Sequence, residues 1–162
     1  MHVAVLADTH LRSADLGRLP EPVVRAVARA DVLVHAGDVV APGALRAMGA
    51  LAPVHAVLGN NDHELAGTLP EALVLELGGV EVAVVHDAGR REGRAARLRR
   101  RFPTAAVVVF GHSHVPVDEV GLDGQILFNP GSATQRRAQP RRTFGVLELD
   151  GGKVRRRAIV PV

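Results

Sequence analysis

Short apolar runs that end in a polar residue recur along the chain. Five such runs are rich in Val and stop at Asp, Asn or His, and they read VAVLADTH, DVLVHAGD, VHAVLGNND, VEVAVVHD and AVVVFGHSH. Continuous apolar stretches of this length are typical of parallel strands that are buried on both faces of a sheet. We therefore predict strands at residues 2–7, 32–35, 54–58 and 80–85, and a fifth in the run that precedes Gly111. Their common carboxyl end would form one edge of a sheet.

Helical patterns alternate with these strands. A helix is predicted around residues 21–30, where prolines suit the first turn, and a second helix is predicted near 43–50. The arginine-rich segment 90–101 has the pattern of an amphipathic helix, with Ala95, Leu98 and Phe102 turned inward.

The chain changes character after His114. Strand-like pieces joined by Gly and Asp turns follow, at residues 115–120, 125–132, 142–150 and 153–162. Asp150, Gly151 and Gly152 mark a hairpin between the last two pieces. Alternating strands and helices followed by a β-rich tail predict an α/β fold of two packed β-sheets flanked by helices.

Length and composition limit the class of protein. A chain of 162 residues suits a single domain over residues 1–162, because chains of this size bury about 70% of their unfolded surface. With no Cys, a metal site must use imidazole, carboxylate and carbonyl ligands, which excludes zinc fingers and iron–sulfur clusters. The first residues read as a strand rather than a signal peptide, and no apolar stretch approaches the roughly 20 residues of a membrane span. We expect a soluble, cytoplasmic protein without a membrane partner.

Most of the basic character is local. The formal net charge is +3, yet seven arginines lie within residues 90–101. We interpret them as the solvated face of the predicted helix, with contact to nucleic-acid phosphates as the alternative. Aromatic residues make up only 2% of the chain, and no Trp or Tyr is present to stack on bases. We therefore do not expect a dedicated nucleic-acid-binding module.

The polar residues at the strand ends are candidate metal ligands. They are Asp8, His10, Asp38, Asn60, His86, His112 and His114. In open α/β sheets the ligand binds beyond the carboxyl ends of the strands, where all seven residues are expected. A single Asp or His at such a place is commonly a cap or a packing residue, but seven together are too many for one ion and suit two. Gly37, Gly59 and Gly111 precede ligands, and a missing side chain lets the backbone approach an ion closely.

Read in order, these residues form a specific series of motifs. The series is Asp8-Thr9-His10, Gly37-Asp38, Gly59-Asn60-Asn61-Asp62, His86, Gly111-His112-Ser113-His114 and Asn129-Pro130-Gly131-Ser132. It resembles the calcineurin-like metallophosphoesterases over nearly the whole chain, especially the small single-domain prokaryotic members of YfcE type. The resemblance implies the four-layer αββα sandwich of that family.

The resemblance also implies a site for two divalent metals. Asp8, His10 and His114 would bind one metal and Asn60, His86 and His112 the other, with Asp38 bridging the two. Two metals about 3.5–4 Å apart lower the pKa of a shared water and stabilise the attacking and leaving oxygens of an in-line displacement. The implied reaction is the hydrolysis of phosphodiester bonds by a water or hydroxide that bridges both metals. Asn60 would also contact the substrate phosphate, and no covalent nucleophile is needed.

Two positions depart from the family pattern. Asn61 stands where many larger relatives have a His that protonates the leaving oxygen, and an amide cannot act as that acid. The leaving group must then be a weak base, or be protonated by water or by His63. Asp87 stands where many small relatives have Gly, and its carboxylate would either approach the site or cap the next segment. His35 is interpreted as a packing residue. The alternative is that its side chain holds a metal-ligating residue in place.

These residues lead to definite expectations about cofactor and substrate. We expect Mn²⁺, with Ni²⁺, Fe, Co²⁺ and Zn²⁺ as alternatives, because nitrogen and oxygen ligands suit all of them. The resemblance favours small phosphodiesters over monoesters, since the acid is missing and there is no cap domain to build a selective pocket. The alternatives are a phosphomonoesterase or nucleotidase, a nuclease that grips a polyanion with the arginine segment, and a non-catalytic binding scaffold resembling a retromer subunit of this fold. A homo-oligomer is compatible with the resemblance.

Overall fold

Two five-stranded β-sheets pack face to face between helices. The computed structural model describes all 162 residues. The first sheet has the strand order β10-β9-β1-β2-β3. Its strands are β1 (His2–Leu6), β2 (Val32–His35), β3 (Val54–Ala56), β9 (Thr143–Asp150) and β10 (Lys153–Pro161). β1, β2 and β3 are parallel, whereas β9 runs antiparallel to β1 and forms the predicted hairpin with β10.

The second sheet has the order β4-β5-β6-β8-β7. Its strands are β4 (Ala72–Leu77), β5 (Val80–Val85), β6 (Val107–Val109), β7 (Val117–Val120) and β8 (Ile126–Asn129). β5, β6 and β8 are parallel, and the two edge strands β4 and β7 are antiparallel to their neighbours. The antiparallel strands of the two sheets are β9, β10 and β7 from the β-rich tail and β4, which precedes β5.

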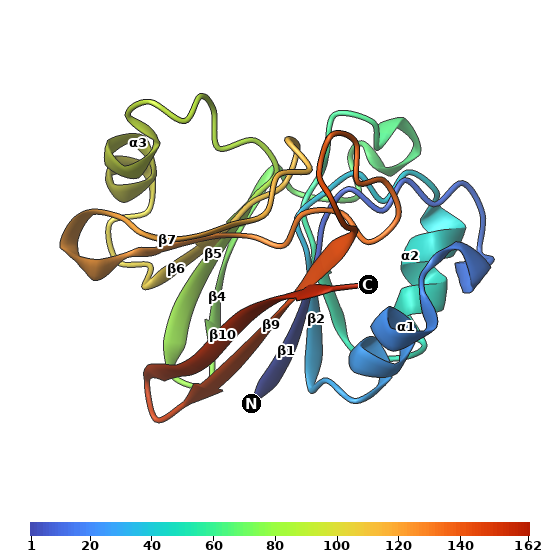
Figure 1. Cartoon of the computed structure of the whole chain (residues 1–162), viewed down its shortest axis with the longest axis horizontal. Helices are drawn as coiled ribbons and strands as arrows, with labels where there is room; N and C mark the ends of the chain where they lie inside the picture. Colours follow the sequence, from blue (N-terminus) through green and yellow to red (C-terminus); the bar gives the residue numbers. More distant parts are fainter.

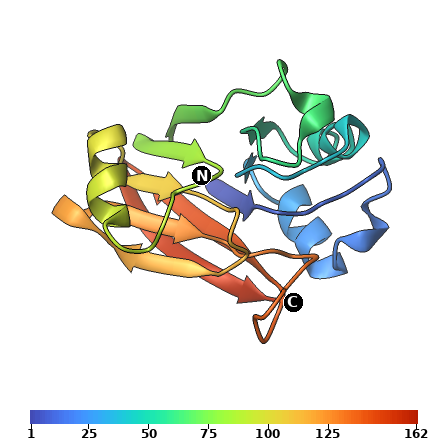
Figure 2. The same ribbon diagram turned by 90° about the horizontal axis from the view of Figure 1, so that it is seen from above.

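Three helices complete the layers. They are α1 (Glu21–Ala28), α2 (Pro42–Gly49) and α3 (Arg94–Arg101), with short 3₁₀ turns η1 (Leu16–Arg18), η2 (His63–Leu65) and η3 (Leu122–Gly124). α1 and α2 cover the first sheet, and α3 covers the outer face of the second, as Figures 1 and 2 show. The predicted four-layer αββα sandwich is confirmed. None of the helices has both the length and the apolar character needed to cross a membrane.

Alternate residues of the central strands enter different apolar layers. Val3 and Val5 of β1 lie in the core between the sheets, whereas Ala4 and Leu6 belong to the layer under α1 and α2. Because both faces are buried, the strand is apolar at every position, and each fully buried Val or Leu side chain contributes about 1.5–3 kcal/mol of transfer free energy. This burial fixes the strands whose ends carry the polar residues.

The structure corrects three sequence expectations. The five strands with polar ends do not share one sheet, because three belong to the first sheet and two to the second. Their carboxyl ends nevertheless meet at the upper end of the molecule in Figure 1. β4 was not predicted, since it is a half-exposed edge strand joined to β5 by the tight turn at Gly78 and Gly79. α3 begins only at Arg94, because Gly93 before it has a left-handed φ of +69°.

Candidate metal centre

Side chains from five strand ends converge at one end of the two sheets. All seven residues selected from the sequence lie there: Asp8 and His10 after β1, Asp38 after β2, Asn60 after β3, His86 after β5, and His112 and His114 after β6. Two packed sheets can bring their strand ends together only if those ends point the same way, and the parallel arrangement of these strands provides this.

Two overlapping groups of donor atoms share Asp8. In one group the donor atoms of Asp8, His10 and His114 lie within 4.8 Å of one another, and in the other those of Asp8, Asp38 and His86 do so. Asp38 faces both sides, because its Oδ2 is 3.6 Å from His10 Nε2 and its Oδ1 is 3.6 Å from His86 Nε2. A carboxylate in this position can reach a different ion with each oxygen.

Asn60 extends the second group toward solvent. Its Oδ1 is 3.0 Å from His86 Nε2 and 2.9 Å from His112 Nδ1. The side-chain nitrogen of Asn60 has no hydrogen-bond partner within the protein, and the residue is exposed. Its oxygen therefore faces the donor cluster while its two N–H groups remain available to an incoming ligand.

Backbone strain is concentrated at these residues. Five of the seven have a left-handed φ, which is +53° at Asp8, +46° at His10, +59° at Asp38, +67° at His112 and +58° at His114. Such conformations cost about 1–3 kcal/mol each in residues other than Gly and persist only where surrounding contacts impose them. Here the loops after β1 and β2 impose them on one another, since Asp8 N–H donates to Gly37 O at 3.0 Å and His10 N–H donates to Asp38 O at 2.9 Å. Clustered strain of this kind marks a functional site.

The glycines before the ligands allow the loops to touch. A Cβ atom added to Gly59 would lie 2.2 Å from the backbone nitrogen of Asp38, and one added to Gly37 would lie 2.6 Å from His86 Nδ1. At Gly111 it would lie 2.9 Å from Asp8 Oδ2. Each glycine therefore permits the close approach of a neighbouring loop, a steric requirement that the sequence could not reveal.

Asp62 joins two of the loops, a role that the sequence analysis missed. This buried carboxylate accepts hydrogen bonds from the backbone N–H groups of Asp38 at 2.9 Å, Val40 at 2.6 Å and Gly59 at 2.7 Å. It thereby holds the β2 loop against the β3 loop. The only sequence signal was its place at the end of the motif Gly59-Asn60-Asn61-Asp62.

Backbone carbonyls orient two of the histidines. His86 Nδ1 lies 2.8 Å from Ala36 O, and His114 Nδ1 lies 2.7 Å from Gln135 O. A carbonyl only accepts, so each Nδ1 must carry a proton, and Nε2 is the ring nitrogen of each histidine that can bind an ion. Burial is also the main cause that lowers the pKa of His114. Neutral imidazoles with oriented lone pairs are what a metal requires.

Asp8 is a buried carboxylate with a hydrogen-bond partner for only one of its two oxygens. It is inaccessible to solvent, and its Oδ2 has no hydrogen-bond partner. Burial, followed by the charge of Asp38, raises the pKa of Asp8 to about 8. Burial would also raise the pKa of Asp38, but hydrogen bonds from Asn61 and the nearby His86 and His10 lower it. One unpartnered oxygen beside a second carboxylate and neutral imidazoles fits a divalent cation.

The remaining candidates have different surroundings. Asn61 contacts the cluster, because its backbone N–H and its Nδ2 donate to Asp38 Oδ1 at 2.8 Å and Oδ2 at 2.6 Å. His63 is exposed on η2 and forms no hydrogen bond to the cluster. Asp87 caps a turn, since its Oδ1 accepts from Gly89 N–H at 2.7 Å. His35 is fully buried, with Nε2 3.0 Å from the hydroxyl of Thr9, and so supports the loop that carries Asp8 and His10.

The segment after β8 encloses the centre from behind. Asn129 Nδ2 donates to Gly111 O at 3.0 Å, and Ser132 Oγ donates to Asp8 O at 2.8 Å. Gly131 has a φ of +73°, and a Cβ there would lie 2.2 Å from Thr143 Oγ1. The motif Asn129-Pro130-Gly131-Ser132 thus connects the ligand loops of the two sheets.

Comparison with known proteins agrees with this architecture. The sequence profile of the calcineurin-like phosphoesterase superfamily domain matches residues 1–152. A protein named probable metallophosphoesterase from Methanothermobacter thermautotrophicus is 31% identical over 156 residues, which are 95% of this chain and 89% of that protein.

Solved structures share the fold. Wild-type Vps29 of Entamoeba histolytica, crystallised with Zn²⁺, aligns with a TM-score of 0.76 and 24% identity over 99% of both chains. A structure described as a novel archaeal phosphodiesterase aligns with a TM-score of 0.71 and 18% identity over 99% of this chain and 100% of its own. At these identities the two structures show the fold alone. Because the family profile and the match to the Methanothermobacter protein cover almost all of the sequence, this chain belongs to the calcineurin-like phosphoesterase superfamily.

Proposed function

We propose that this protein is a phosphodiesterase that uses two divalent metal ions. Membership of the family supports the hydrolysis of phosphoesters in general. The observation that carries the more specific proposal is the pair of overlapping donor groups that share Asp8, whose Oδ2 is buried without a partner, together with Asp38, which lies 3.6 Å from both His10 and His86. Such a cluster of carboxylates and neutral imidazoles is costly without cations.

The ligands divide between two ions as the resemblance implies. Asp8, His10 and His114 would hold one ion, Asn60, His86 and His112 the other, and Asp38 both. When bound, such ions lower the pKa of a water molecule and neutralise negative charge on a phosphate. We propose Mn²⁺, with Ni²⁺, Fe, Co²⁺ and Zn²⁺ as alternatives, since mixed nitrogen and oxygen donors suit all of them.

Side chains of the protein itself orient the reactants. The free amide N–H groups of Asn60 are available to a phosphate oxygen, because its Oδ1 alone faces His86 and His112. Asn61 holds Asp38 in place with two hydrogen bonds. No side chain needs to attack the phosphorus, and water attacks directly.

The surroundings favour small diesters over monoesters. Asn61 cannot supply a proton to the leaving group, and His63 is not attached to the cluster. The groove beside Asn60 and His86 is open and is also lined by Glu71 and Arg101. Without a side-chain acid the leaving group must be stable as an anion, and an open groove leaves room for both ester groups of a diester.

The alternatives have weaker support. The arginines of the 90–101 segment, proposed for a nuclease, are largely engaged within the protein: Arg99 pairs with Asp123 at 3.0 Å, and Arg97 donates to backbone carbonyls, among them Glu92 O at 2.7 Å. A non-catalytic scaffold is the second alternative, because Vps29 structures share the fold. All seven candidate ligands are present here, which favours catalysis.

The test compares a bis-aryl phosphodiester with the matching aryl monoester. Chelator-stripped protein is assayed before and after Mn²⁺ is added, with Asp38→Ala as the inactive variant and Asp150→Ala, an exposed carboxylate at the end of β9, as the matched control. We expect diester hydrolysis that requires Mn²⁺ and Asp38 but not Asp150. Faster hydrolysis of the monoester would indicate a phosphatase. The variant His63→Gln would then test whether His63 is the acid that protonates the leaving group. Inactivity with every divalent metal would favour the scaffold.

A further inference from the structure

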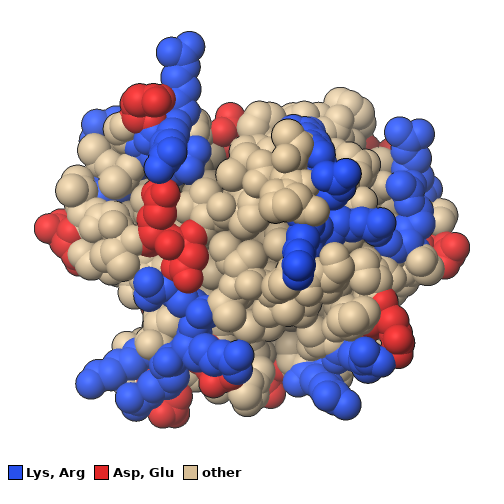
Figure 3. Space-filling model, viewed as in Figure 1, with Lys and Arg blue, Asp and Glu red and all other residues tan.

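A cationic loop lies beside the candidate metal centre. The loop between β8 and β9, residues 130–142, contains Arg136, Arg137, Arg141 and Arg142 and no acidic residue. None of these four arginines forms an ion pair, whereas arginines elsewhere do. Figure 3 shows basic side chains over the region where Figure 1 draws this loop in orange. The sequence had directed attention to the arginines of residues 90–101 instead.

Buried hydrogen bonds attach this loop to the ligand loops. Ser132 Oγ donates to Asp8 O at 2.8 Å, and Thr134 Oγ1 donates to Thr9 O at 2.8 Å. Gln135 O receives the Nδ1 proton of His114 at 2.7 Å. The first half of the loop therefore has a fixed position relative to the candidate ligands, and an exposed residue follows two places after Gln135.

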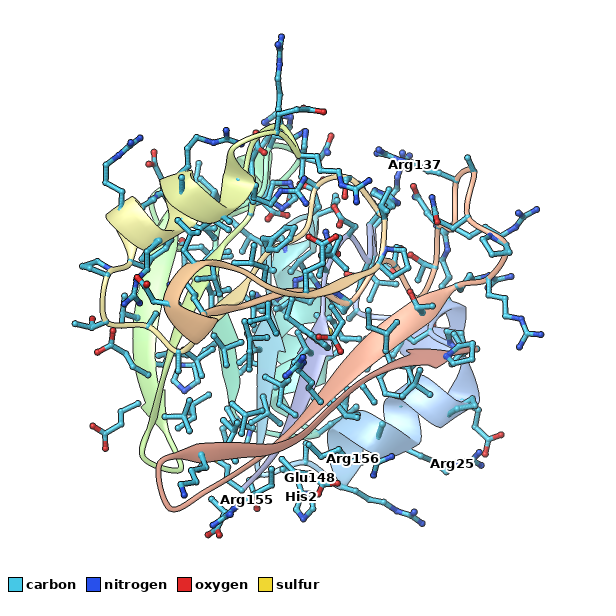
Figure 4. The ribbon with its side chains drawn as sticks, turned by 60° about the vertical axis from the view of Figure 1, so that its left-hand side comes forward. His2, Arg25, Arg137, Glu148, Arg155 and Arg156 are labelled. Atoms are coloured by element: carbon cyan, nitrogen blue, oxygen red, sulfur yellow. The ribbon has the colours of Figure 1, made fainter.

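That residue is Arg137, which occupies the rim of the centre. Its backbone is left-handed, with a φ of +50°, and its Nη1 lies 3.5 Å from His112 O. Figure 4 shows Arg137 at the end of the molecule opposite Arg25 and Arg156, each of which pairs with a glutamate. The neighbouring Arg136 instead donates to Gln139 O within its own loop, at 2.8 Å. Arg137 is exposed and its contact with His112 is long, so most of its N–H donors are free.

The guanidinium of Arg137 stands next to the candidate ligands. Its Nη1 contacts the backbone oxygen of His112, and Gln135, two residues earlier, holds the ring of His114. A cation at the edge of a centre that would hold two further cations is stabilised when an anion such as a phosphate binds between them.

We propose that Arg137 binds the phosphate group of the substrate. Its guanidinium donates hydrogen bonds to phosphate oxygens on the side of the centre that faces the 130–142 loop. Arginine suits this task because its planar donors match the geometry of a phosphate. This inference rests on the proposed function, to which it adds a substrate-binding residue.

Three variants test it with the bis-aryl phosphodiester and Mn²⁺. Arg137→Asn removes the charge with a residue that tolerates a left-handed φ, Arg137→Lys retains the charge without the planar donors, and Arg136→Asn is the matched control. A lost charge-assisted hydrogen bond lowers kcat/KM by about tenfold to a hundredfold. We expect that loss in Arg137→Asn, an intermediate loss in Arg137→Lys, and wild-type kinetics in Arg136→Asn.

A second measurement does not depend on turnover. Inorganic phosphate, which stabilises whichever protein binds it, is added to Mn²⁺-loaded protein, and unfolding is followed by circular dichroism because the chain has no Trp or Tyr. We expect phosphate to raise the Tm of the wild type and of Arg136→Asn, but much less that of Arg137→Asn. A purely structural role would lower the Tm of Arg137→Asn without phosphate and leave the phosphate-dependent increase unchanged.

The two measurements separate the two proposals. If Arg137→Asn hydrolyses the diester like the wild type and gains the same Tm from phosphate, the inference about Arg137 is wrong while the phosphodiesterase proposal stands. If the wild type hydrolyses neither ester, the phosphodiesterase proposal fails, and the phosphate titration alone decides whether Arg137 binds the anion.

Discussion

Replacement of Asp8 by Asn should stabilise the metal-free protein while it removes the response to metal. Asp8 is solvent-inaccessible, one of its carboxylate oxygens has no partner, and a second carboxylate lies nearby. Without metal the folded protein must therefore either bury an uncompensated charge or keep the carboxyl protonated. An amide has nearly the same shape and no charge, so it avoids this cost.

The size of the effect follows from the pKa of Asp8, which burial and Asp38 raise from 3.8 to about 8. At pH 7 the folded state retains the proton and the unfolded chain does not. One pKa unit corresponds to about 1.36 kcal/mol, so the span of roughly three units between 3.8 and 7 corresponds to about 4 kcal/mol. The amide must still accept the hydrogen bond from His112 N–H, now 3.1 Å long. We expect a net gain of about 2–4 kcal/mol, or a Tm increase of about 4–16 °C for a chain of this length.

The same pKa predicts a pH dependence. Because the folded-state pKa is above the unfolded value, the contribution of Asp8 to stability is complete below pH 3.8 and decreases as the pH rises through about 8. Asn does not titrate. The difference in stability between Asp8→Asn and the wild type should therefore widen between pH 5 and pH 8, by at most about 1.36 kcal/mol per pH unit.

The assay is thermal unfolding of chelator-stripped protein at pH 5, 6, 7 and 8, repeated with Mn²⁺. The matched control is Asp62→Asn, because Asp62 is also a buried carboxylate but accepts three backbone hydrogen bonds. An amide nitrogen cannot accept, so this control should be destabilised by about 1–3 kcal/mol. A lower Tm for metal-free Asp8→Asn than for the wild type throughout this pH range would refute the reasoning, as would a Tm increase with Mn²⁺ in this variant equal to that of the wild type.

Two further predictions concern the residues that support the centre. Gly59→Ala would place a Cβ 2.2 Å from both the backbone nitrogen and Oδ1 of Asp38, so we expect a loss of about 1–3 kcal/mol and much weaker Mn²⁺ binding in calorimetry. The control Gly49→Ala, in α2 with no atom within 4 Å of the added Cβ, should not be destabilised, and equal effects of both changes would contradict this explanation. Burial, followed by the charge of His86, lowers the pKa of His35 to about 3, so its contribution to stability is present above pH 6.5 and is lost as the pH falls toward 3. The free energy of unfolding, measured with denaturant, should therefore fall less between pH 6.5 and pH 4 in His35→Gln than in the wild type. The same pH dependence in both proteins would contradict the attribution of this fall to His35.

Local patterns in the sequence were enough for most of the fold. A strand that is buried on both faces must be apolar at every position, so β1, β2, β3, β5 and β6 could be predicted from their apolar runs. β4 lacked this signal because an edge strand is only partly buried, and its pairing with β5 depends on the turn at Gly78. The division of the strands between two sheets was not predictable from the runs either, since every run looks alike whichever sheet it joins.

What the sequence by itself determined about the site is its chemistry. The absence of Cys restricted the donors to nitrogen and oxygen, and the polar residue at the end of each run identified the seven side chains that meet in space. Strand direction explains this convergence within each sheet, because parallel strands carry their final residues to the same end of a sheet.

Only the tertiary structure decided how these side chains are supported. His112 N–H meets Asp8 Oδ1 across 104 residues of sequence, and Gln135 O meets His114 Nδ1 across 21. Asp62, Gln135 and Arg137 lie in loops whose conformation is set by such distant contacts rather than by a local periodicity. Hydrophobic periodicity records which face of a strand is buried, but it contains no information about which loop will lie against another.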